Sequence, residues 1–243
     1  MNIKLVLEYD GTSYHGFQIQ LGAVTVQEKI EKAIDKFVTS EFKFYSAGRT
    51  DAGVHAIEQV CNFKCDDLRV SPEYLCIAMN RYLPNDIRIK ESSLVSDDFH
   101  SRFSAKERVY KYVIYNSLIG SAIYRNYSWH VKYDLDVDSM IKGAKYIEGY
   151  HDFKAFTSAT YKDSTMRIVN YTDLKKEGKF IIFRISANAY TRSMVRNIVG
   201  TLVEVGRGKR KFEEIQKILI SQERQEAGLC APPQGLFLER IKY

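Results

Sequence analysis

Strand-like and helix-like patterns alternate along this chain, and their order limits the possible folds more than any other feature. The first part of the chain reads as a strand at 3–10, a helix from Val26, strands at 42–47 and 57–65, a helix from Pro72 and a strand at 86–95. The first helix opens with a capping box, Thr25-Val26-Gln27-Glu28. Its apolar stripe consists of Val26, Ile30, Ala33, Ile34, Phe37 and Val38. The order β-α-β-β-α-β predicts an α+β unit with helices packed on a sheet.

The rest of the chain contains the same kinds of element. We expect a strand at 108–115, a helix starting at Asp136 or Asp138, strands at 165–176 and 179–189, helices at 191–205 and 211–221, and a last strand at 236–242. The sequence therefore predicts two domains, residues 1–105 and 106–243. Each is expected to be ferredoxin-like or RRM-like, and together they are expected to form an extended mixed, mainly antiparallel sheet with a central cleft.

Composition and charge suggest a polyanionic partner and a cytoplasmic protein. The 243 residues carry a net charge of +6, which favours nucleic acid as a ligand. The 17 tyrosines and 13 phenylalanines are compatible with base stacking, although aromatic residues in strands also simply fill cores. No apolar run reaches the length of a membrane span, and acidic residues follow the start too soon for a signal peptide.

The sequence indicates no cofactor and no metal. The four cysteines fit neither a disulfide framework nor a zinc-ligand spacing. The segment from Gly48 to Gly53 lacks the Gly-Lys-Ser/Thr ending of a phosphate-binding loop. His55, His100 and His151 share no ligand spacing. We therefore expect chemistry carried by side chains alone.

The segment Gly48-Arg49-Thr50-Asp51-Ala52-Gly53-Val54-His55-Ala56 is the strongest candidate for such chemistry. It follows an alternating run, Phe42, Phe44 and Ser46, that indicates the end of a strand. Arg49, two residues away, would favour the charged form of Asp51, and a charged aspartate can act as a nucleophile. A plain turn would place the same residues here, because Asp-Ala-Gly suits a turn. Local chemistry alone leaves both interpretations open.

Other candidate residues are a tyrosine on a strand and several cations. Tyr110 points to the same strand face as Tyr112, and Arg192 and Arg196 would lie one turn apart on the helix at 191–205. Further cations are Arg102, Arg207 and Lys209, the last two within the basic run Gly206-Arg207-Gly208-Lys209-Arg210-Lys211. Each has a structural alternative: strand tyrosines pack in cores, and helix arginines and basic turns face solvent. From the residues alone, the protein is a catalyst or a binding module.

Eight motifs in order then reveal a resemblance along nearly the whole chain. They are Tyr9-Asp10-Gly11-Thr12-Ser13-Tyr14-His15-Gly16-Phe17-Gln18, the segment at 48–56, Leu83-Pro84-Asn85-Asp86-Ile87, Phe99-His100-Ser101-Arg102-Phe103-Ser104-Ala105, Tyr110-Lys111-Tyr112-Val113-Ile114-Tyr115-Asn116, Gly149-Tyr150-His151-Asp152-Phe153, Met194-Val195-Arg196-Asn197-Ile198-Val199-Gly200 and Ala231-Pro232-Pro233-Gln234-Gly235-Leu236. The chain closely resembles the TruA family of tRNA pseudouridine synthases.

The resemblance implies conversion of uridine to pseudouridine in the tRNA anticodon stem-loop, at positions 38 to 40, by a homodimer. Asp51 matches the family's essential aspartate, the proposed nucleophile. Arg49 matches the arginine that brings the target nucleotide into the site. Tyr110 matches the tyrosine that packs on the base, and Arg196 the arginine that pairs with the aspartate. Ribosomal RNA as substrate and a non-catalytic RNA-binding module are the alternatives.

Two departures from the family pattern concern RNA binding. Ile19 stands where relatives often have arginine, and Ser193 where they often have histidine. Neither belongs to the set formed by the aspartate, the arginines and the tyrosine. The departures therefore leave the chemistry in place and make a different RNA target conceivable.

Overall fold

The computed structural model describes residues 1–158 and 163–243, which form two compact units. Unit 1 comprises Met1–Lys106 and Phe237–Tyr243, and unit 2 comprises Glu107–Leu236. The C-terminal strand is therefore part of unit 1, whereas the sequence placed it in a second domain spanning 106–243. The reason is that this strand pairs with His55 and Ala56, which are far from it in the sequence.

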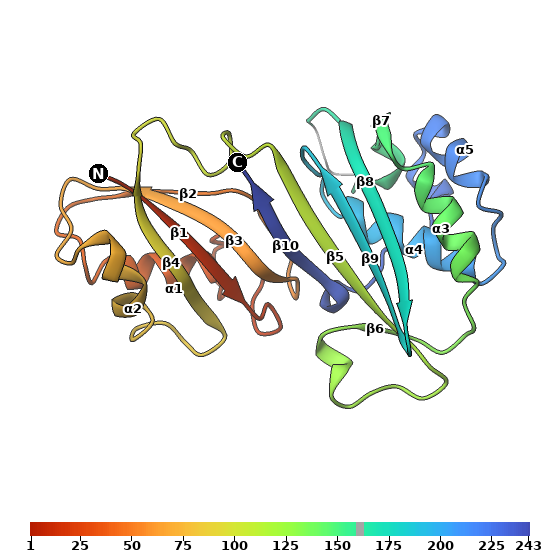
Figure 1. Ribbon diagram of the computed structural model, residues 1–243, viewed down its shortest axis with the longest axis horizontal. Helices are drawn as coiled ribbons and strands as arrows, with labels where there is room; N and C mark the ends of the chain where they lie inside the picture. Colours follow the sequence, from red (N-terminus) through yellow and green to blue (C-terminus); the bar gives the residue numbers. More distant parts are fainter. Residues whose placement is uncertain (159–162) are drawn as a thin grey trace. The chain divides into compact units, whose positions relative to one another are not determined.

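Unit 1 is an α+β unit whose elements follow the predicted order (Figure 1). They are β1 (Asn2–Tyr9), α1 (Val26–Ile34), β2 (Lys43–Ser46), β3 (His55–Lys64), α2 (Leu75–Met79), β4 (Ile87–Val95) and, from the C-terminus, β10 (Leu236–Lys242). A short 3-10 helix, Pro72–Tyr74, precedes α2. The antiparallel strand β1 lies between β4 and β3, and it covers one edge of β3 along its length.

The other edge of β3 is shared by two strands. Antiparallel β2 pairs with the residues from Cys61 to Lys64, and parallel β10 pairs with His55 and Ala56. The segment that links β2 to β3 contains Asp51. The start of β3, where that segment ends, is therefore fixed by β1 on one side and by the C-terminus of the chain on the other.

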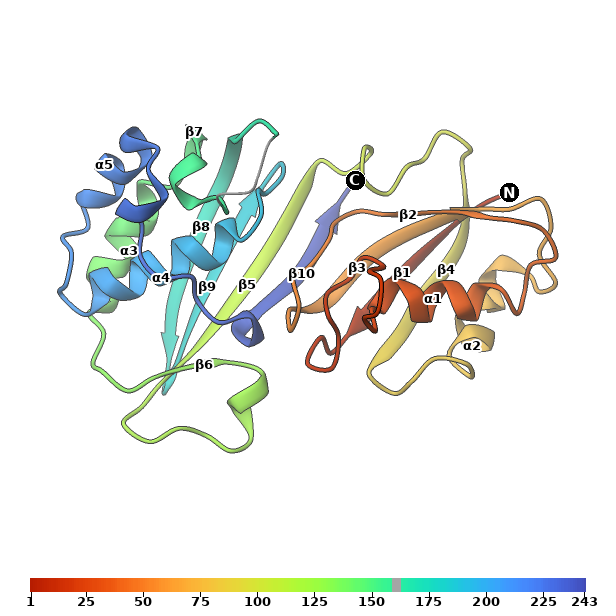
Figure 2. The ribbon, with the colours of Figure 1, turned by 180° about the vertical axis from the view of Figure 1, so that it is seen from behind.

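The core of unit 1 lies between one face of the sheet and the two helices (Figures 1 and 2). Its sheet residues alternate along the strands, as a half-buried sheet requires, and include Ile3, Leu5, Leu7, Cys61, Phe63, Ile87 and Ile89. The helices contribute Val26, Ile30, Ala33, Ile34, Leu75 and Met79. The predicted capping box is confirmed, because the Thr25 hydroxyl accepts the Glu28 N–H at 3.4 Å.

Unit 2 is built around an antiparallel sheet with the strand order β5-β9-β8-β7. Its strands are β5 (Glu107–Asn116), β6 (Trp129–Val131), β7 (Gly149–Asp152), β8 (Met166–Glu177) and β9 (Phe180–Ala187). Its helices are α3 (Val137–Lys145), α4 (Met194–Gly206) and α5 (Glu214–Ser221). The short strand β6 pairs in parallel with the end of β5. Asp136, one of the two predicted start residues, is the N-cap of α3.

The core of unit 2 lies between this sheet and α4, which crosses one sheet face (Figure 2). Helix α3 packs against both α4 and β8. The buried side chains include Tyr112, Ile114, Ile181, Phe183 and Ile185 from strands and Met140, Ala144, Ile198 and Leu202 from helices. In the described part of the chain, no helix is long and apolar enough to span a membrane.

Some element ends differ from those predicted. Helix α1 ends at Ile34, so Phe37 and Val38 lie beyond the helix that their spacing suggested. Likewise α2 ends at Met79, before Tyr82. Strands β6 and β7 have three and four residues and were not predicted, because such short strands show no resolvable period.

Candidate active site

The segment between β2 and β3 carries Asp51, and hydrogen bonds fix it residue by residue. The Ala47 N–H donates to the Val60 carbonyl at 2.9 Å. The buried Gln59 side chain donates to the Gly48 carbonyl, also at 2.9 Å. The Thr50 hydroxyl lies 2.8 Å from that of Tyr9, and both side chains are buried. Asp51 thus follows a backbone that is anchored on β3 and β1.

Asp51 itself begins a tight turn. The Val54 N–H donates to the Asp51 carbonyl at 3.1 Å, which closes a four-residue turn. Gly53, the third residue of that turn, has φ = +76°, a conformation that favours glycine. The turn that the sequence favours here is therefore confirmed, with Asp51 half-buried in it, and the role of Asp51 as a nucleophile stays a prediction.

A second loop, at 10–17, packs directly on this turn. The Phe17 N–H donates to the Thr50 carbonyl at 3.1 Å, and the Gly53 N–H donates to the Tyr14 carbonyl at 3.3 Å. The approach requires two glycines. A Cβ at Gly11 would lie 2.0 Å from the Val54 carbonyl oxygen, and one at Gly16, where φ is +92°, would lie 2.9 Å from that of Thr50. Gly11 and Gly16 of the motif at 9–18 therefore allow this loop to pack on the turn that carries Asp51.

His55 joins the two loops from the start of β3. Its ring is buried and stacks on Phe237 of β10 at 4.7 Å between centroids. Its Nδ1 accepts the Gly11 N–H at 3.1 Å and also lies 3.1 Å from an Asp10 carboxylate oxygen. A nitrogen that accepts a backbone N–H carries no proton. The hydrogen bond to Gly11 therefore excludes an Nδ1–H ion pair with Asp10, and His55 acts as a structural link.

Arg49 lies close to Asp51 in sequence but does not bind it. Its side chain is exposed, and within the described residues its guanidinium forms no hydrogen bond or ion pair. The sequence predicted that Arg49 stabilises the charge of Asp51. The structure instead leaves the Arg49 charge available to a ligand.

Tyr110 is held in unit 2 by another tyrosine. It lies on β5, is 8% exposed, and meets the ring of Tyr190 edge-on at 4.9 Å. The Tyr190 hydroxyl shares its one proton between the carbonyl oxygens of Arg108 and Ile185, at 3.1 and 2.8 Å. Burial raises the pKa of Tyr190 well above its usual value, so this hydroxyl stays protonated. Tyr190 was not identified from the sequence, where it is one aromatic residue among many.

Arg196 is oriented by the segment that precedes β10. Its Nε donates to the Ala231 carbonyl at 2.7 Å, and the Ala231 N–H donates back to the Arg196 carbonyl at 3.1 Å. The segment lies on α4 because Gly200 has no side chain, since a Cβ there would lie 1.7 Å from the Leu229 carbonyl oxygen. The motifs at 194–200 and 231–236 therefore pack against each other, and the motif at 231–236 positions Arg196.

Arg192 is not on the helix that carries Arg196. The sequence placed both on one helix face, but α4 begins at Met194. Ser193, between them, has φ = +62° and breaks the helical path. Arg192 is exposed and lies before the start of α4, so it does not share a helix face with Arg196.

The remaining predicted cations lie in two loops, one after β4 and one after α4. Arg102 is exposed in the loop after β4, and its guanidinium lies 5.4 Å from the Phe103 ring centroid. Arg207, just beyond α4, stacks on the Tyr133 ring at 3.9 Å. Lys209 is exposed, whereas Arg210 of the same basic run pairs with Glu204 at 2.5 Å. Part of that run is therefore structural.

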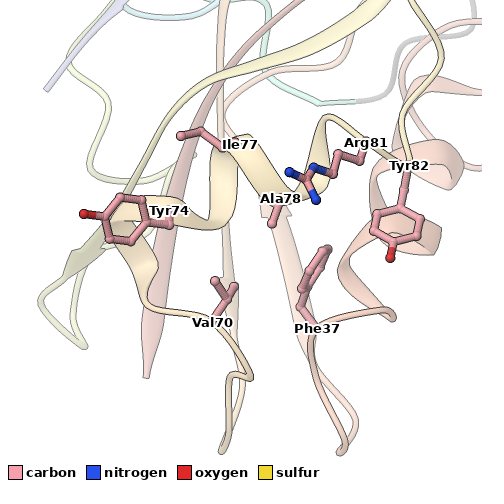
Figure 3. Close-up of a pocket in the computed structure, with 7 residues that line it drawn as sticks. All are labelled: Phe37, Val70, Tyr74, Ile77, Ala78, Arg81 and Tyr82. Carbon is pink, nitrogen blue, oxygen red and sulfur yellow. The ribbon is translucent and has the colours of Figure 1, made fainter.

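The described residues contain no group of three or more His, Cys, Asp or Glu side chains arranged to hold a metal. A pocket of about 260 Å³ lies elsewhere in unit 1 (Figure 3). It is lined mainly by apolar side chains: Phe37, Val70, Tyr74, Ile77, Ala78, Arg81 and Tyr82. None of the predicted site residues lines it, so the pocket does not identify the reaction site.

Comparison with known proteins gives consistent matches over the whole chain. A family model described as tRNA pseudouridine synthase matches residues 5–104 and 144–243. The protein "tRNA pseudouridine synthase A" of Thermoanaerobacter sp. (strain X514) is 47% identical over 100% of this chain and 99% of its own length. That of Acetivibrio thermocellus is 44% identical over the same shares. A solved structure of a Cbf5-Nop10-Gar1 complex covers 74% of this chain and 40% of its own at 16% identity, with a TM-score of 0.38, a likeness too weak to bear on the site.

Proposed function

The chain belongs to the tRNA pseudouridine synthase family, and we propose that it modifies the anticodon stem-loop of tRNA, at positions 38 to 40, with Asp51 as the nucleophile. As a member of this family it is an isomerase that converts uridine to pseudouridine in tRNA. The observation that carries the assignment of Asp51 is its setting, a half-buried aspartate on a turn that the loop at 10–17 holds by backbone contacts.

The reaction places clear demands on such a site. The bond from ribose C1′ to N1 of uracil breaks, and a bond from C1′ to C5 forms. C5 loses a proton and N1 gains one, so the change is redox-neutral and needs no co-reactant. The base must leave the helical stack before it can turn. A carboxylate that attacks C6 of the base or C1′ of the ribose meets these demands.

We assign the other site residues complementary roles. Arg49 has a guanidinium without a protein partner in the described structure, which suits a contact to the nucleotide phosphate that draws the base out. Tyr110 packs on the base, and its ring is held in place by Tyr190. The family resemblance gives Arg196 the role of partner to the aspartate, and within unit 2 its Nε is held by the Ala231 carbonyl. Arg102, Arg192, Arg207 and Lys209 contact the RNA backbone.

We also propose that the protein works in the cytoplasm as a homodimer, as the family resemblance implies. The exposed apolar side chains around the pocket, Tyr74, Ile77 and Tyr82, form a surface of the kind that subunit contacts bury (Figure 3). Light scattering tests the dimer, with an expected mass of twice the 28.1 kDa of one chain. A mass of one chain at all concentrations contradicts it.

The function is tested by mapping pseudouridine in tRNA and ribosomal RNA from cells that lack this protein. The wild-type chain or the Asp51→Asn variant is then restored. We expect wild type to return pseudouridine at tRNA positions 38 to 40, and Asp51→Asn to return none. If only ribosomal sites return, tRNA is the wrong substrate. If no site returns with wild type, the enzyme assignment fails.

A further inference from the structure

An exposed aromatic cluster lies on unit 1 away from Asp51. The rings of Tyr45 and His100 are 4.5 Å apart, and those of His100 and Phe103 are 4.4 Å apart. We call these three residues the aromatic platform. Phe103, at its outer end, is 75% exposed. None of the three has a role in the reaction described above.

The exposed position of Phe103 is fixed by its own loop. The Ser104 N–H donates to the His100 carbonyl at 2.9 Å, and the His100 N–H donates to the Ser104 hydroxyl at 3.1 Å. Nδ1 of His100 accepts the N–H groups of Arg102 and Phe103 at 3.1 and 3.4 Å. Burial lowers the pKa of His100 from 6.5, and the charges of Arg102 and Lys64 lower it further. The ring therefore stays unprotonated at neutral pH and keeps accepting these bonds.

Buried polar contacts fasten the same loop to the sheet. The Asn62 side chain on β3 accepts the Ser101 N–H at 2.9 Å and donates to Asn2 at 2.8 Å. Asn2 in turn donates to the Phe99 carbonyl at 2.9 Å. Tyr45 stands opposite Asn62 in the pairing of β2 with β3. The backbone that presents this exposed phenylalanine is therefore held in place, so a ligand that binds its ring need not order the loop.

The charges around the platform favour a polyanion. Arg102 lies over the Phe103 ring at 5.4 Å. Lys64 and Lys43 are exposed cross-strand partners next to Tyr45. Asp97 and Asp98 are the nearby acids, and the Lys64 ammonium donates to the backbone carbonyl of Asp97 at 2.6 Å. Aromatic faces beside cations are the arrangement on which proteins stack unpaired nucleobases.

We propose that the aromatic platform is a second RNA contact, on which an unpaired nucleobase of the substrate stacks against Phe103. His55 and Asn62 are seven positions apart on β3, a span of about 23 Å, so a base on the platform is a different one from the uridine at Asp51. An RNA therefore contacts both sites only if an unpaired nucleotide lies at the matching distance from its target uridine. The inference rests on the proposed function only in taking tRNA as the ligand.

The test compares four variants for tRNA affinity by anisotropy and for pseudouridine formation at saturating tRNA. Phe103→Ala should weaken affinity about tenfold, because one base loses its stacking partner. Phe103→Leu keeps apolar bulk without the aromatic face and should weaken affinity too, whereas Phe103→Trp should retain it. Tyr150→Ala is the matched control, since Tyr150 on β7 is also 65% exposed and has no role in the proposed site or subunit contact, and it should bind as wild type.

Several results separate the proposal from its alternatives. The turnover of Phe103→Ala at saturating tRNA and its salt dependence of binding should match wild type, because stacking involves neither chemistry nor charge. Wild-type affinity for Phe103→Ala overturns the platform, and wild-type affinity for Phe103→Leu overturns stacking. If Phe103→Ala lowers turnover and leaves tRNA affinity unchanged, the platform is also overturned. Absence of pseudouridine with the wild-type chain rejects the proposed function instead, and the affinity comparison still decides the platform.

Discussion

Asp51 owes its position to backbone contacts that require glycine at two positions of the loop at 10–17. Gly11 and Gly16 lie against the carbonyls of Val54 and Thr50, on either side of the aspartate. The backbone that carries Asp51 is therefore placed by main-chain contacts with the loop at 10–17. This explains how a residue in a turn can be held accurately enough for covalent chemistry.

Substitution of Gly16 tests this placement. Gly16→Ala forces a left-handed residue, at about 1–2 kcal/mol, and moves the Thr50 carbonyl, which a new Cβ would meet at 2.9 Å. Gly22→Ala is the control, because Gly22 has φ = +73° but no atom within 4 Å of a Cβ. We expect both variants to lose stability in urea and only Gly16→Ala to lose turnover. Equal turnover in the two variants would contradict the role assigned to the loop at 10–17.

At the scale of elements, α4 and the segment before β10 act as one unit that orients Arg196. Gly200 allows the contact, and Gly228 supports it, since its N–H donates to the Thr201 hydroxyl at 2.9 Å. The Tyr112 hydroxyl holds the same segment through the Pro232 carbonyl at 2.7 Å. The arginine is thereby tied to β5, the strand that carries Tyr110.

Gly200→Ala should disrupt this unit. The variant gains up to about 1 kcal/mol of helix propensity, but its Cβ would overlap the Leu229 backbone, and overpacking of this kind costs about 1–3 kcal/mol. We expect a lower melting temperature and a reduced turnover number with little change in tRNA affinity. Gly143→Ala on α3 is the control, because its Cβ would meet side chains and no backbone, the nearest atom being the flexible end of Ile215 at 2.8 Å. Full turnover in Gly200→Ala would refute the positioning role.

The elements also show how far sequence reasoning reaches. Long periodic segments and the capping box of α1 were predicted because their signals are local. The pairing of β10 with β3 was not, because it joins residues at opposite ends of the chain through only two register pairs. Arg192 was misplaced because the left-handed residue Ser193 leaves no signature that separates it from a helical serine. Asp51 could be singled out, whereas the loop contacts that hold it could not.

At the scale of the whole molecule, the net charge of +6 predicts binding that depends on salt. The logarithm of tRNA affinity should fall linearly with the logarithm of salt concentration. Lys209→Ala should make that slope shallower by about one, because Lys209 is exposed and assigned to a phosphate. Arg210→Ala is the control, because Arg210 is already paired with Glu204. A flat salt response, or equal effects of the two variants, would contradict the backbone contacts.

The central claim, that Asp51 is the nucleophile, is tested most directly by purified Asp51→Asn acting on tRNA. The change removes the charge and keeps the shape, so the turn and the RNA contacts persist. We predict tRNA affinity equal to wild type and pseudouridine formation reduced by at least about a thousandfold. Substantial residual turnover with normal binding would contradict the assignment of Asp51.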